Sequence, residues 1–344
     1  MKRQHFTLAI IAILSCTIAD AQPSSTHKRR TPGTDSGRGF VTDMPMVHDP
    51  VMAEDQGTYL MFSTGRGIQV AESNDRKTWT VWRRTPLMDS IPAWTHDSVP
   101  GFKDHVWAPD IIRYRDRWWL SYSCSTFGKN TSAIGLLSTD RLMPLSEEGE
   151  NRMQWRDEGP IVCSQRGRDN WNAIDSNFII DEKGEPWLCF GSFWDGIQLV
   201  RLDSTLHIAQ PSNQRTIARR KTGGGENPIE APFIFRHDGY YYLFVSWDYC
   251  CRGMESSYKV AVGRSRSIEG PYLDKEGKDM AAGGGSLVIE GDKKTFEAMG
   301  HSAAYHFQGK DFFICHGYSI EYGGQSILVE REIQWEEGWP RLEL

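Results

Sequence analysis

The sequence repeats a two-part pattern five times, and this repeat limits the folds that are open to the chain. Each unit opens with a short segment carrying one acidic residue or histidine, and an aromatic run follows. The openings are Val47-His48-Asp49-Pro50, Trp107-Ala108-Pro109-Asp110, Ala173-Ile174-Asp175-Ser176, Ile229-Glu230-Ala231-Pro232 and Gly300-His301-Ser302-Ala303. They recur every 55 to 70 residues or so, and a regular period of this kind indicates a repeat architecture.

Each unit contains further short runs that are typical of strands rather than helices. The aromatic second runs are residues 57–62, 117–122, 185–190, 239–244 and 310–314, and the third runs are residues 67–71, 132–137, 196–200, 258–262 and 326–330. A fourth, outer strand carries tryptophan in residues 77–80 and 333–335. Four strands in each of five units predict an all-β chain that folds as one five-bladed β-propeller domain.

The N-terminus has the pattern of a secretory signal peptide. Two basic residues precede an apolar stretch, residues 6–16, that is too short to span a bilayer. Ala19-Asp20-Ala21 fits a small-x-small cleavage site. We therefore assign residues 1–21 to a signal peptide and expect a periplasmic or extracellular protein; lipoprotein anchoring through Cys16 is the less favoured alternative.

The remaining chain divides into a leader and one domain. Residues 22–39 are rich in Ser, Thr, Lys, Arg, Gly and Pro and predict a flexible leader, whereas residues 40–344 show no linker or change in composition. The net charge of −6 is mild and dispersed, which argues against a nucleic-acid partner. We expect a monomer without a transmembrane segment.

Six cysteines follow the predicted signal peptide, and none has the paired spacing of a zinc site. Cys124, Cys189 and Cys315 lie in apolar runs and are expected to be buried free thiols. Cys250 and Cys251 are adjacent and could form a vicinal disulfide in an oxidising compartment. The sequence leaves that alternative open.

The five polar openings are expected to converge, because the first strand of each propeller blade lines the central channel. All five are placed at the same relative position, although Ala108-Pro109 shifts the register of Asp110, which we interpret as structural. A single strand-start carboxylate often caps a turn. Several converged carboxylates repel one another and cost stability, so a functional site is the better interpretation.

Two carboxyl groups of different pKa are what glycoside hydrolysis requires. Glu230 has apolar neighbours, which favour the protonated form expected of a general acid. Asp49 lies in a more polar segment and suits a general base, and Asp175 could orient the acid and adjust its pKa. The 13 tryptophans also suit sugar binding, since sugar faces pack on aromatic rings.

The chain resembles glycoside hydrolase family 43, and within it the endo-1,5-α-L-arabinanases. The ordered motifs that carry the resemblance begin near residue 43 and continue to the C-terminus. These motifs include the first four openings and Gly300-His301 of the fifth. The others include Ser125-Thr126-Phe127-Gly128, Trp171-Asn172, Phe190-Gly191-Ser192-Phe193-Trp194-Asp195-Gly196, Tyr249-Cys250-Cys251-Arg252-Gly253, Ser257-Tyr258-Lys259-Val260 and Gly263-Arg264-Ser265.

The resemblance implies inverting hydrolysis of the internal α-1,5 bonds of arabinan, a pectin side chain. It assigns Asp49 as general base, Glu230 as general acid and Asp175 as the residue that orients the acid and modulates its pKa. It implies substrate contacts from His48, Gly128, Asn172, Ser192, Phe193 and Trp194. It also implies a cation, commonly calcium, on the axis with His301 as ligand, and no organic cofactor.

One position departs from the family pattern. Ser176 follows Asp175, where the family usually has a proline that would fix the backbone. The carboxylate itself is present, so we still expect activity.

Three other functions were weighed against this interpretation. An exo-acting α-L-arabinofuranosidase or β-xylosidase of the same family usually has an added β-sandwich, for which we expect no room before Leu344. A non-catalytic glycan-binding propeller would lack one of the three carboxylates. A WD-repeat interaction propeller would show its own marks in each blade, and these do not recur here.

Overall fold

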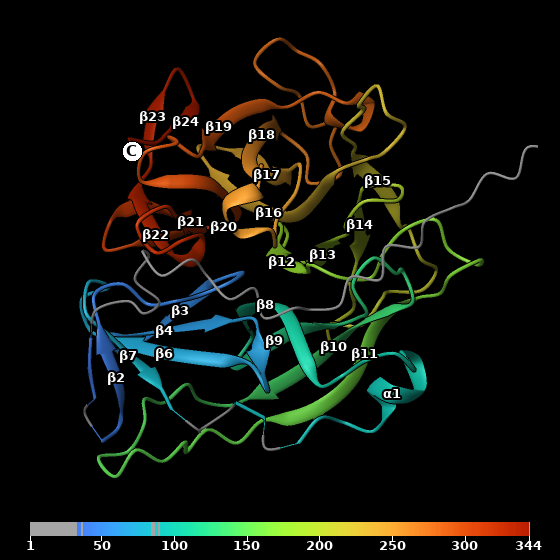
Figure 1. Cartoon of the computed structure of the whole chain (residues 1–344). Coiled ribbons are helices and arrows are strands. Elements are labelled where there is room, and N and C mark those ends of the chain that lie inside the picture. The colour runs from blue at the N-terminus through green and yellow to red at the C-terminus, as the bar shows by residue number, and fades with distance from the viewer. Residues whose placement is uncertain (1–32, 36, 84–86, 89, 344) are drawn as a thin grey trace, which may run out of the picture.

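The structure is a computed structural model that describes residues 33–35, 37–83, 87–88 and 90–343. Almost every regular element is a strand, and the strands form five sheets around a central axis (Figure 1). The predicted five-bladed propeller and single domain are confirmed. We number the blades 1 to 5 in chain order; their first strands are β3, β8, β12, β16 and β20, which lie nearest to the middle of the ring.

Blade 1 is the widest sheet, with the order β1-β2-β7-β6-β4-β3. Its strands are β1 (Thr34–Asp35), β2 (Gly39–Thr42), β3 (Val51–Asp55), β4 (Thr58–Ser63), β6 (Gln69–Ser73) and β7 (Trp79–Trp82). The predicted tryptophan strand is therefore confirmed as β7. β1, the first residue of β2 and residues 33, 37 and 38 fall inside the segment that we assigned to the leader. Residues 22–32 and 36 of that segment, together with the predicted signal peptide, lie outside the described residues.

Blades 2, 3 and 4 are sheets of consecutive antiparallel strands, as the sequence predicts. Blade 2 has β8 (His105–Tyr114), β9 (Arg117–Cys124), β10 (Ser132–Thr139) and β11 (Arg156–Ser164), with β5 (Gly65–Arg66) paired to β8. Blade 3 has β12 (Asn177–Ile180), β13 (Pro186–Phe190), β14 (Ile197–Arg201) and β15 (Arg215–Ala218), and blade 4 has β16 (Ile229–His237), β17 (Tyr240–Trp247), β18 (Lys259–Ser265) and β19 (Ser286–Glu290). In the part of the chain that the structure describes, three short helical turns join strands: α1 (Trp94–Ser98), η1 (Gly253–Glu255) and η2 (Met280–Ala282).

Blade 5 differs from the prediction of four strands. Its sheet holds three, β20 (Phe296–Phe307), β21 (Lys310–Ser319) and β22 (Gln325–Glu332). The expected outer strand near Trp335 instead forms a separate hairpin, β23 (Gln334–Glu336) with β24 (Trp339–Arg341). The left-handed backbone of Glu337 and Gly338 turns the chain back on itself, so β23 pairs with β24 rather than with β22.

The ring closes where the start of blade 1 meets the outer edge of blade 5. The amide of Val47 donates to the carbonyl of Ser326 at 3.2 Å, and the amide of Leu328 donates to the carbonyl of Pro45 at 3.1 Å. Met46 forms an isolated antiparallel bridge with Ile327. Residues 45–47 thus cover the edge that the missing fourth strand would otherwise leave unpaired.

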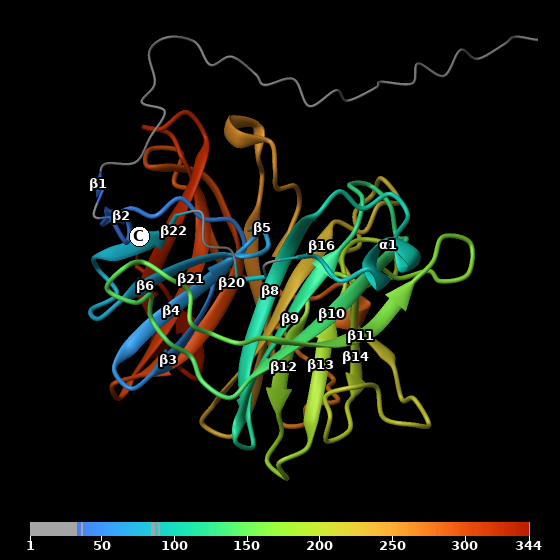
Figure 2. The same ribbon diagram turned by 90° about the horizontal axis from the view of Figure 1, so that it is seen from below.

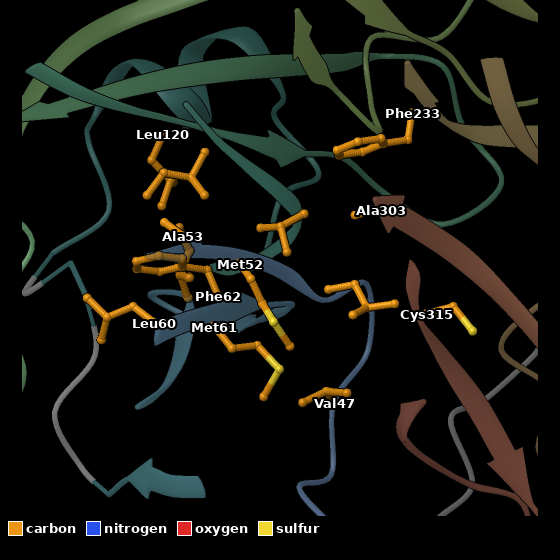
Figure 3. Packing of buried hydrophobic residues seen from close by; sticks show 14 of the residues in the cluster. Val47, Met52, Ala53, Leu60, Met61, Phe62, Leu120, Phe233, Ala303 and Cys315 are labelled. Atoms are coloured by element: carbon orange, nitrogen blue, oxygen red, sulfur yellow. The ribbon is translucent and has the colours of Figure 1, made fainter. Parts of the chain in front are cut away.

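The core lies between blades rather than within one sheet, because both faces of each sheet are covered. The largest cluster includes Met52 and Phe62 of blade 1, Leu120 of blade 2, and Ala303 and Cys315 of blade 5 (Figure 3). Cys124, Cys189 and Cys315 are fully buried free cysteines, as expected.

Seen from the side, the long first strand β8 runs between the two ends of the ring (Figure 2). At one end the functional residues gather. Within the described residues no helix has the length and apolar character needed to cross a membrane.

Candidate active site

One large cavity of about 1070 Å³ lies at the end of the axis where the first strands begin. All ten sequence-predicted site residues line it: His48, Asp49, Gly128, Asn172, Asp175, Ser192, Phe193, Trp194, Glu230 and His301. Residues from every blade contribute to its wall. The structure therefore brings together side chains that are up to 253 residues apart in sequence, between His48 and His301.

A left-handed residue recurs in the opening of each blade and sets the direction of the site side chains. Asp49, Ala108, Asp175, Ala231 and His301 all have φ between 43° and 58°. This conformation is uncommon for residues other than glycine. In β8, β16 and β20 the left-handed residue lies within the strand, and the pairing register with the next strand shifts at that residue. Such a shift is a β-bulge, which bends the end of the strand.

This repeat corrects one sequence-based expectation. The five polar residues do not share one position: Asp49, Asp175 and His301 hold the left-handed position itself, whereas Ala108 and Ala231 hold it in blades 2 and 4. Glu230 precedes Ala231 by one residue, and Asp110 follows Ala108 by two. The alignment of short sequence motifs hides these offsets, because it cannot see where the strand bulges.

Side chains near the end of the preceding blade's second strand hold these left-handed residues in place. The amide of Asp49 donates to Nδ1 of His316 at 3.1 Å, and the amide of Ala108 donates to Oγ1 of Thr64 at 2.9 Å. In the same way Ser123 accepts from the amide of Asp175 at 3.1 Å and Ser246 accepts from that of His301 at 2.8 Å. Each contact joins two neighbouring blades, so the ring and the site are built by the same bonds.

Asp49 is surrounded by groups that stabilise its ionised form. Its Oδ1 lies 2.7 Å from Nδ1 of His48 and 2.9 Å from Nδ1 of His301, and its Oδ2 accepts from Oγ1 of Thr64 at 2.5 Å. Burial raises the pKa of Asp49, but attraction to His301 and His48 outweighs it and holds the pKa well below the usual range. Asp49 is therefore a carboxylate in the free protein.

The pKa values of the two histidines beside Asp49 are shifted in the opposite direction, upward. Burial lowers the pKa of His301, yet Asp49 and Asp175 raise it to about 8. Burial also opposes the charge on His48, and Asp49 raises its pKa well above the usual value. The carboxylate and its two partners thus form a compact charged group in a site with little water contact.

Asp175 has a different environment from Asp49, although both occupy the same backbone position. Burial, together with the nearby charges of Glu230 and Asp49, raises its pKa well above the usual range, while His301 opposes that rise. Its Oδ2 accepts from the amide of Ala231 at 3.1 Å. Asp175 therefore contacts the backbone next to Glu230.

Glu230 is fixed by hydroxyl groups on both sides of its carboxyl group. Oε2 accepts from the hydroxyl of Ser192 at 2.8 Å, and Oε1 accepts from the hydroxyl of Tyr258 at 2.8 Å. Burial, followed by the charge of Glu230, raises the pKa of Tyr258 well above the usual value, so this phenol stays protonated and keeps its donor. The carboxyl group therefore has one defined orientation at the cavity wall.

The remaining predicted residues supply surface for a ligand. The left-handed pair Phe193 and Trp194 turns the loop after β13 outward, and Trp194 remains 40% exposed at the cavity. Asn172 is buried, and its Oδ1 accepts from the hydroxyl of Ser132 at 2.7 Å. Gly128 adopts φ 71° beside Phe127, which is 77% exposed. Exposed aromatic faces beside fixed polar groups suit the binding of sugars.

The donor atoms near Asp49 fit a metal ion poorly. Among the described residues one cluster has suitable spacing, namely His48, Asp49 and His316. Nδ1 of His316 accepts from the Asp49 amide and its Nε2 lies 3.3 Å from the Tyr318 hydroxyl. Both ring nitrogens of His48 also have partners, Asp49 and Tyr318. These nitrogens already form hydrogen bonds and are not available to a cation.

His301, the predicted metal ligand, lies outside that cluster and uses Nδ1 for Asp49. It can offer a cation one nitrogen, Nε2. Calcium prefers six to eight oxygen ligands, so the described side chains do not form a calcium site by themselves, and we assign no chemical step to an ion.

Five residues of the site were missed by sequence reasoning: Thr64, Ser123, Ser246, Tyr258 and His316. A signal for four of them was present. Thr64, Ser123, Ser246 and His316 stand near or just after the ends of the aromatic second strands, so aligning those strand ends would have revealed a second polar ring. Tyr258 gave no such signal, since it resembles any aromatic residue before an apolar strand.

The fold and the site together define a propeller-type glycoside hydrolase. The model of glycosyl hydrolases family 43 matches residues 42–340, and the chain belongs to that family. A Cellvibrio japonicus protein named extracellular exo-α-(1→5)-L-arabinofuranosidase is 42% identical over 306 residues, which cover 86% of each chain. A Bacillus subtilis protein named extracellular endo-α-(1→5)-L-arabinanase 1 is 39% identical over 302 residues, 86% of this chain and 87% of that protein.

Solved structures agree with this assignment. A structure described as an exo-1,5-α-L-arabinanase from a bovine ruminal metagenomic library matches with a TM-score of 0.82 and 51% identity, over 88% of this chain and 98% of that one. A Cellvibrio cellulosa α-L-arabinanase complexed with arabinohexaose matches with a TM-score of 0.81 and 41% identity, over 87% of this chain and 96% of that one.

Proposed function

We propose that the protein hydrolyses the α-1,5 bonds of arabinan with inversion, using Asp49 as general base and Glu230 as general acid. The observation that carries the proposal is that two carboxyl groups on the wall of one cavity have different partners. Asp49 is held ionised by His48 and His301, whereas Glu230 is held by two neutral hydroxyls. Two carboxyl groups in unlike environments are the requirement for acid–base glycoside cleavage.

In the proposed reaction Asp49 takes a proton from a water molecule, and the resulting hydroxide attacks the anomeric carbon. Glu230 gives its proton to the departing glycosidic oxygen, so the C–O bond breaks as the new bond forms. The products are two shorter chains: one ends in a sugar with inverted anomeric configuration, and the other carries a free hydroxyl at the former glycosidic oxygen. An inverting mechanism requires space for this water molecule, so the two carboxyl groups of inverting enzymes are about 6.5 to 9.5 Å apart.

Asp175 is proposed to position Glu230 and to modulate its protonation. It contacts the amide of Ala231, one residue after the acid.

Internal cleavage of linear arabinan is the mode that we propose first. The cavity volume of about 1070 Å³ exceeds what one sugar residue requires, and aromatic residues from two blades, Phe127 and Trp194, are exposed along it. Both features support a substrate of several sugar residues with contacts from His48, Asn172 and the Ser192-Phe193-Trp194 loop.

Cleavage from a chain end is the second candidate. Two relatives carry exo in their names, at 42% and 51% identity, whereas the Bacillus subtilis relative is named an endo enzyme at 39%. Debranched arabinan separated by product size over time distinguishes the modes. Internal cleavage gives a broad range of oligosaccharides from the first minutes; a single short product from the start would contradict it, and an intact substrate would contradict hydrolysis itself.

The stereochemistry needs its own test. Proton NMR of the first product released from an α-linked arabino-oligosaccharide should show the β-anomer before mutarotation. Initial release of the α-anomer would contradict the inverting assignment of Asp49.

The location of the protein and an axial ion are further proposals from the sequence. Export through the signal peptide agrees with two relatives that are named extracellular. A calcium ion at His301 would need water for most of its ligands. The proposed reaction does not depend on it.

A further inference from the structure

Cys250 and Cys251 lie on the wall of the same cavity as the proposed catalytic residues. Their sulfur atoms are 2.6 Å apart, and both are free cysteines in the structure. Cys251 is exposed, whereas the described thiols Cys124, Cys189 and Cys315 are fully buried. An oxidant that enters the groove would therefore meet this pair before the buried thiols.

The environment of Cys251 favours a reactive thiolate. Its Sγ lies 3.8 Å from Nε2 of His48, and Nδ1 of the same imidazole contacts Asp49 at 2.7 Å. A histidine between a carboxylate and a thiol is an arrangement that activates the sulfur. The adjacent Cys250 thiol is the main cause that lowers the pKa of the Cys251 thiol to about 6; burial opposes this shift and His48 adds to it. In turn, Cys251 and burial raise the pKa of the Cys250 thiol.

Hydrogen bonds connect the cysteine pair to the proposed base. The backbone amide of Cys251 donates to the hydroxyl of Tyr318 at 2.7 Å. That hydroxyl lies 2.9 Å from Nε2 of His48, and His48 contacts Asp49. A change in the backbone at Cys251 would thus reach the carboxylate through two side chains.

We propose that Cys250 and Cys251 form a thiol–disulfide modification site of the groove, which reacts with small disulfides and whose oxidation slows hydrolysis. The effect on rate rests on the proposed function. The Cys251 thiolate attacks one sulfur of the small disulfide, forms a mixed disulfide and releases one thiolate. Cys250 then loses its proton, attacks the Cys251 sulfur and releases the second thiolate, so two protein thiols are oxidised while one disulfide is reduced to two thiols.

Formation of the Cys250–Cys251 disulfide would be reversible, and the disulfide would disturb the site. Consecutive Cα atoms are about 3.8 Å apart, closer than the roughly 4.4–6.8 Å of ordinary disulfides, and strained disulfides are more easily reduced. The bond removes the Cys251 thiolate from His48. It also constrains the peptide whose amide contacts Tyr318.

The test uses the full chain, reduced with dithiothreitol, desalted and incubated with oxidised glutathione. Alkylation followed by peptide mapping reports the state of each cysteine without any substrate, and hydrolysis of debranched arabinan reports the rate. We expect Cys250 and Cys251 alone to lose alkylation, the rate to fall about tenfold, as loss of one hydrogen bond to a charged group would produce, and dithiothreitol to restore both.

Three variants give the controls. Cys250→Ser should stop at one glutathione on Cys251. Cys251→Ser should leave Cys250 without an adduct on the same time scale, because the attacking thiolate is gone. Cys163→Ser, which alters a half-buried thiol outside the cavity, should behave like wild type.

Two results would overturn the proposal. Full alkylation of both cysteines after oxidation would exclude the modification site. A disulfide that forms without a change in rate would exclude its coupling to Asp49. Peptide mapping does not depend on enzyme activity. If the protein fails to cleave arabinan, the proposed function is refuted, but the mapping still shows whether Cys250 and Cys251 are oxidised.

Discussion

Blades 1 and 2 each open with an aspartate, but the two carboxyl groups have different surroundings. Asp49 holds the left-handed position of its blade and faces the cavity between two histidines. Asp110 follows the left-handed Ala108 by two residues, about 7 Å further along the strand. There it is buried away from the cavity and accepts from the amide of Phe178 at 2.6 Å.

This difference shows that position relative to the left-handed residue, rather than the presence of a carboxyl group, decides whether an opening aspartate reaches the cavity. Asp110 joins blade 2 to blade 3 through Phe178 and through the Asn177 side chain at 3.2 Å. Burial, against these hydrogen bonds, raises its pKa to about 7. The four predictions below test the contrast, from the largest expected effect to the smallest.

The largest effect should come from neutralising the proposed acid and base. Asp49→Asn and Glu230→Gln should each lower arabinan turnover about 10³-fold, the range expected for loss of acid–base catalysis. Their melting temperatures should stay near that of the parent, since both side chains remain similar in size. Initial rates of reducing-sugar release and calorimetry provide the measurements.

Asp110→Asn is the matched control for that experiment. Asparagine keeps an oxygen for the Phe178 amide, so turnover should change less than about threefold. A comparable loss in this variant, or a largely retained rate in Asp49→Asn, would show that the contrast between the two aspartates is wrong.

A smaller effect is expected from Thr64, which joins the two openings directly. Its hydroxyl donates to Asp49 and accepts from the amide of Ala108. Thr64→Val keeps the shape but removes both bonds, and kcat should fall about 10- to 100-fold. Because the lost donor stabilised the carboxylate, the acidic limb of the kcat/KM profile should move to higher pH.

Thr64→Ser keeps the hydroxyl and should retain most of the rate and the parent pH profile. If valine lowers kcat without moving the acidic limb, Thr64 acts on packing rather than on Asp49.

The ionisation of Asp110 should affect the stability of the protein rather than its activity. Its folded pKa of about 7 lies above the unfolded value near 3.9, so the folded state binds more protons between these values. The contribution of Asp110 to the free energy of unfolding should therefore fall as pH rises from about 4 to 7, by roughly 2 to 4 kcal/mol, and level off above that range. Urea unfolding of Asp110→Asn should lack this decline, and parallel curves for the two proteins would contradict the prediction.

Removal of divalent metal should have the smallest effect. The described side chains offer an ion one nitrogen of His301, so little binding energy is available from the protein. Exhaustive treatment with a chelator should change turnover less than about twofold. A larger loss that calcium restores would show that water and His301 hold an ion needed for activity.

The five-fold pattern of openings and aromatic strands predicted most of the fold. Second and third strands were found in every blade, because alternating apolar residues and turns are local signals. The end of the chain was predicted wrongly near Trp335, where a hairpin forms instead of an outer strand. Which neighbour a short strand pairs with depends on the turn that follows it, and residue type alone did not decide that.

The sequence by itself determined four ionisable groups of the site, since Asp49, Asp175, Glu230 and His301 recur at blade openings. Only the tertiary structure decided their separate roles. Two aspartates at the same backbone position, Asp49 and Asp175, have pKa values displaced in opposite directions. The reason is physical: a carboxyl group's charge depends on burial and on neighbours a few ångströms away, and those neighbours come from other blades.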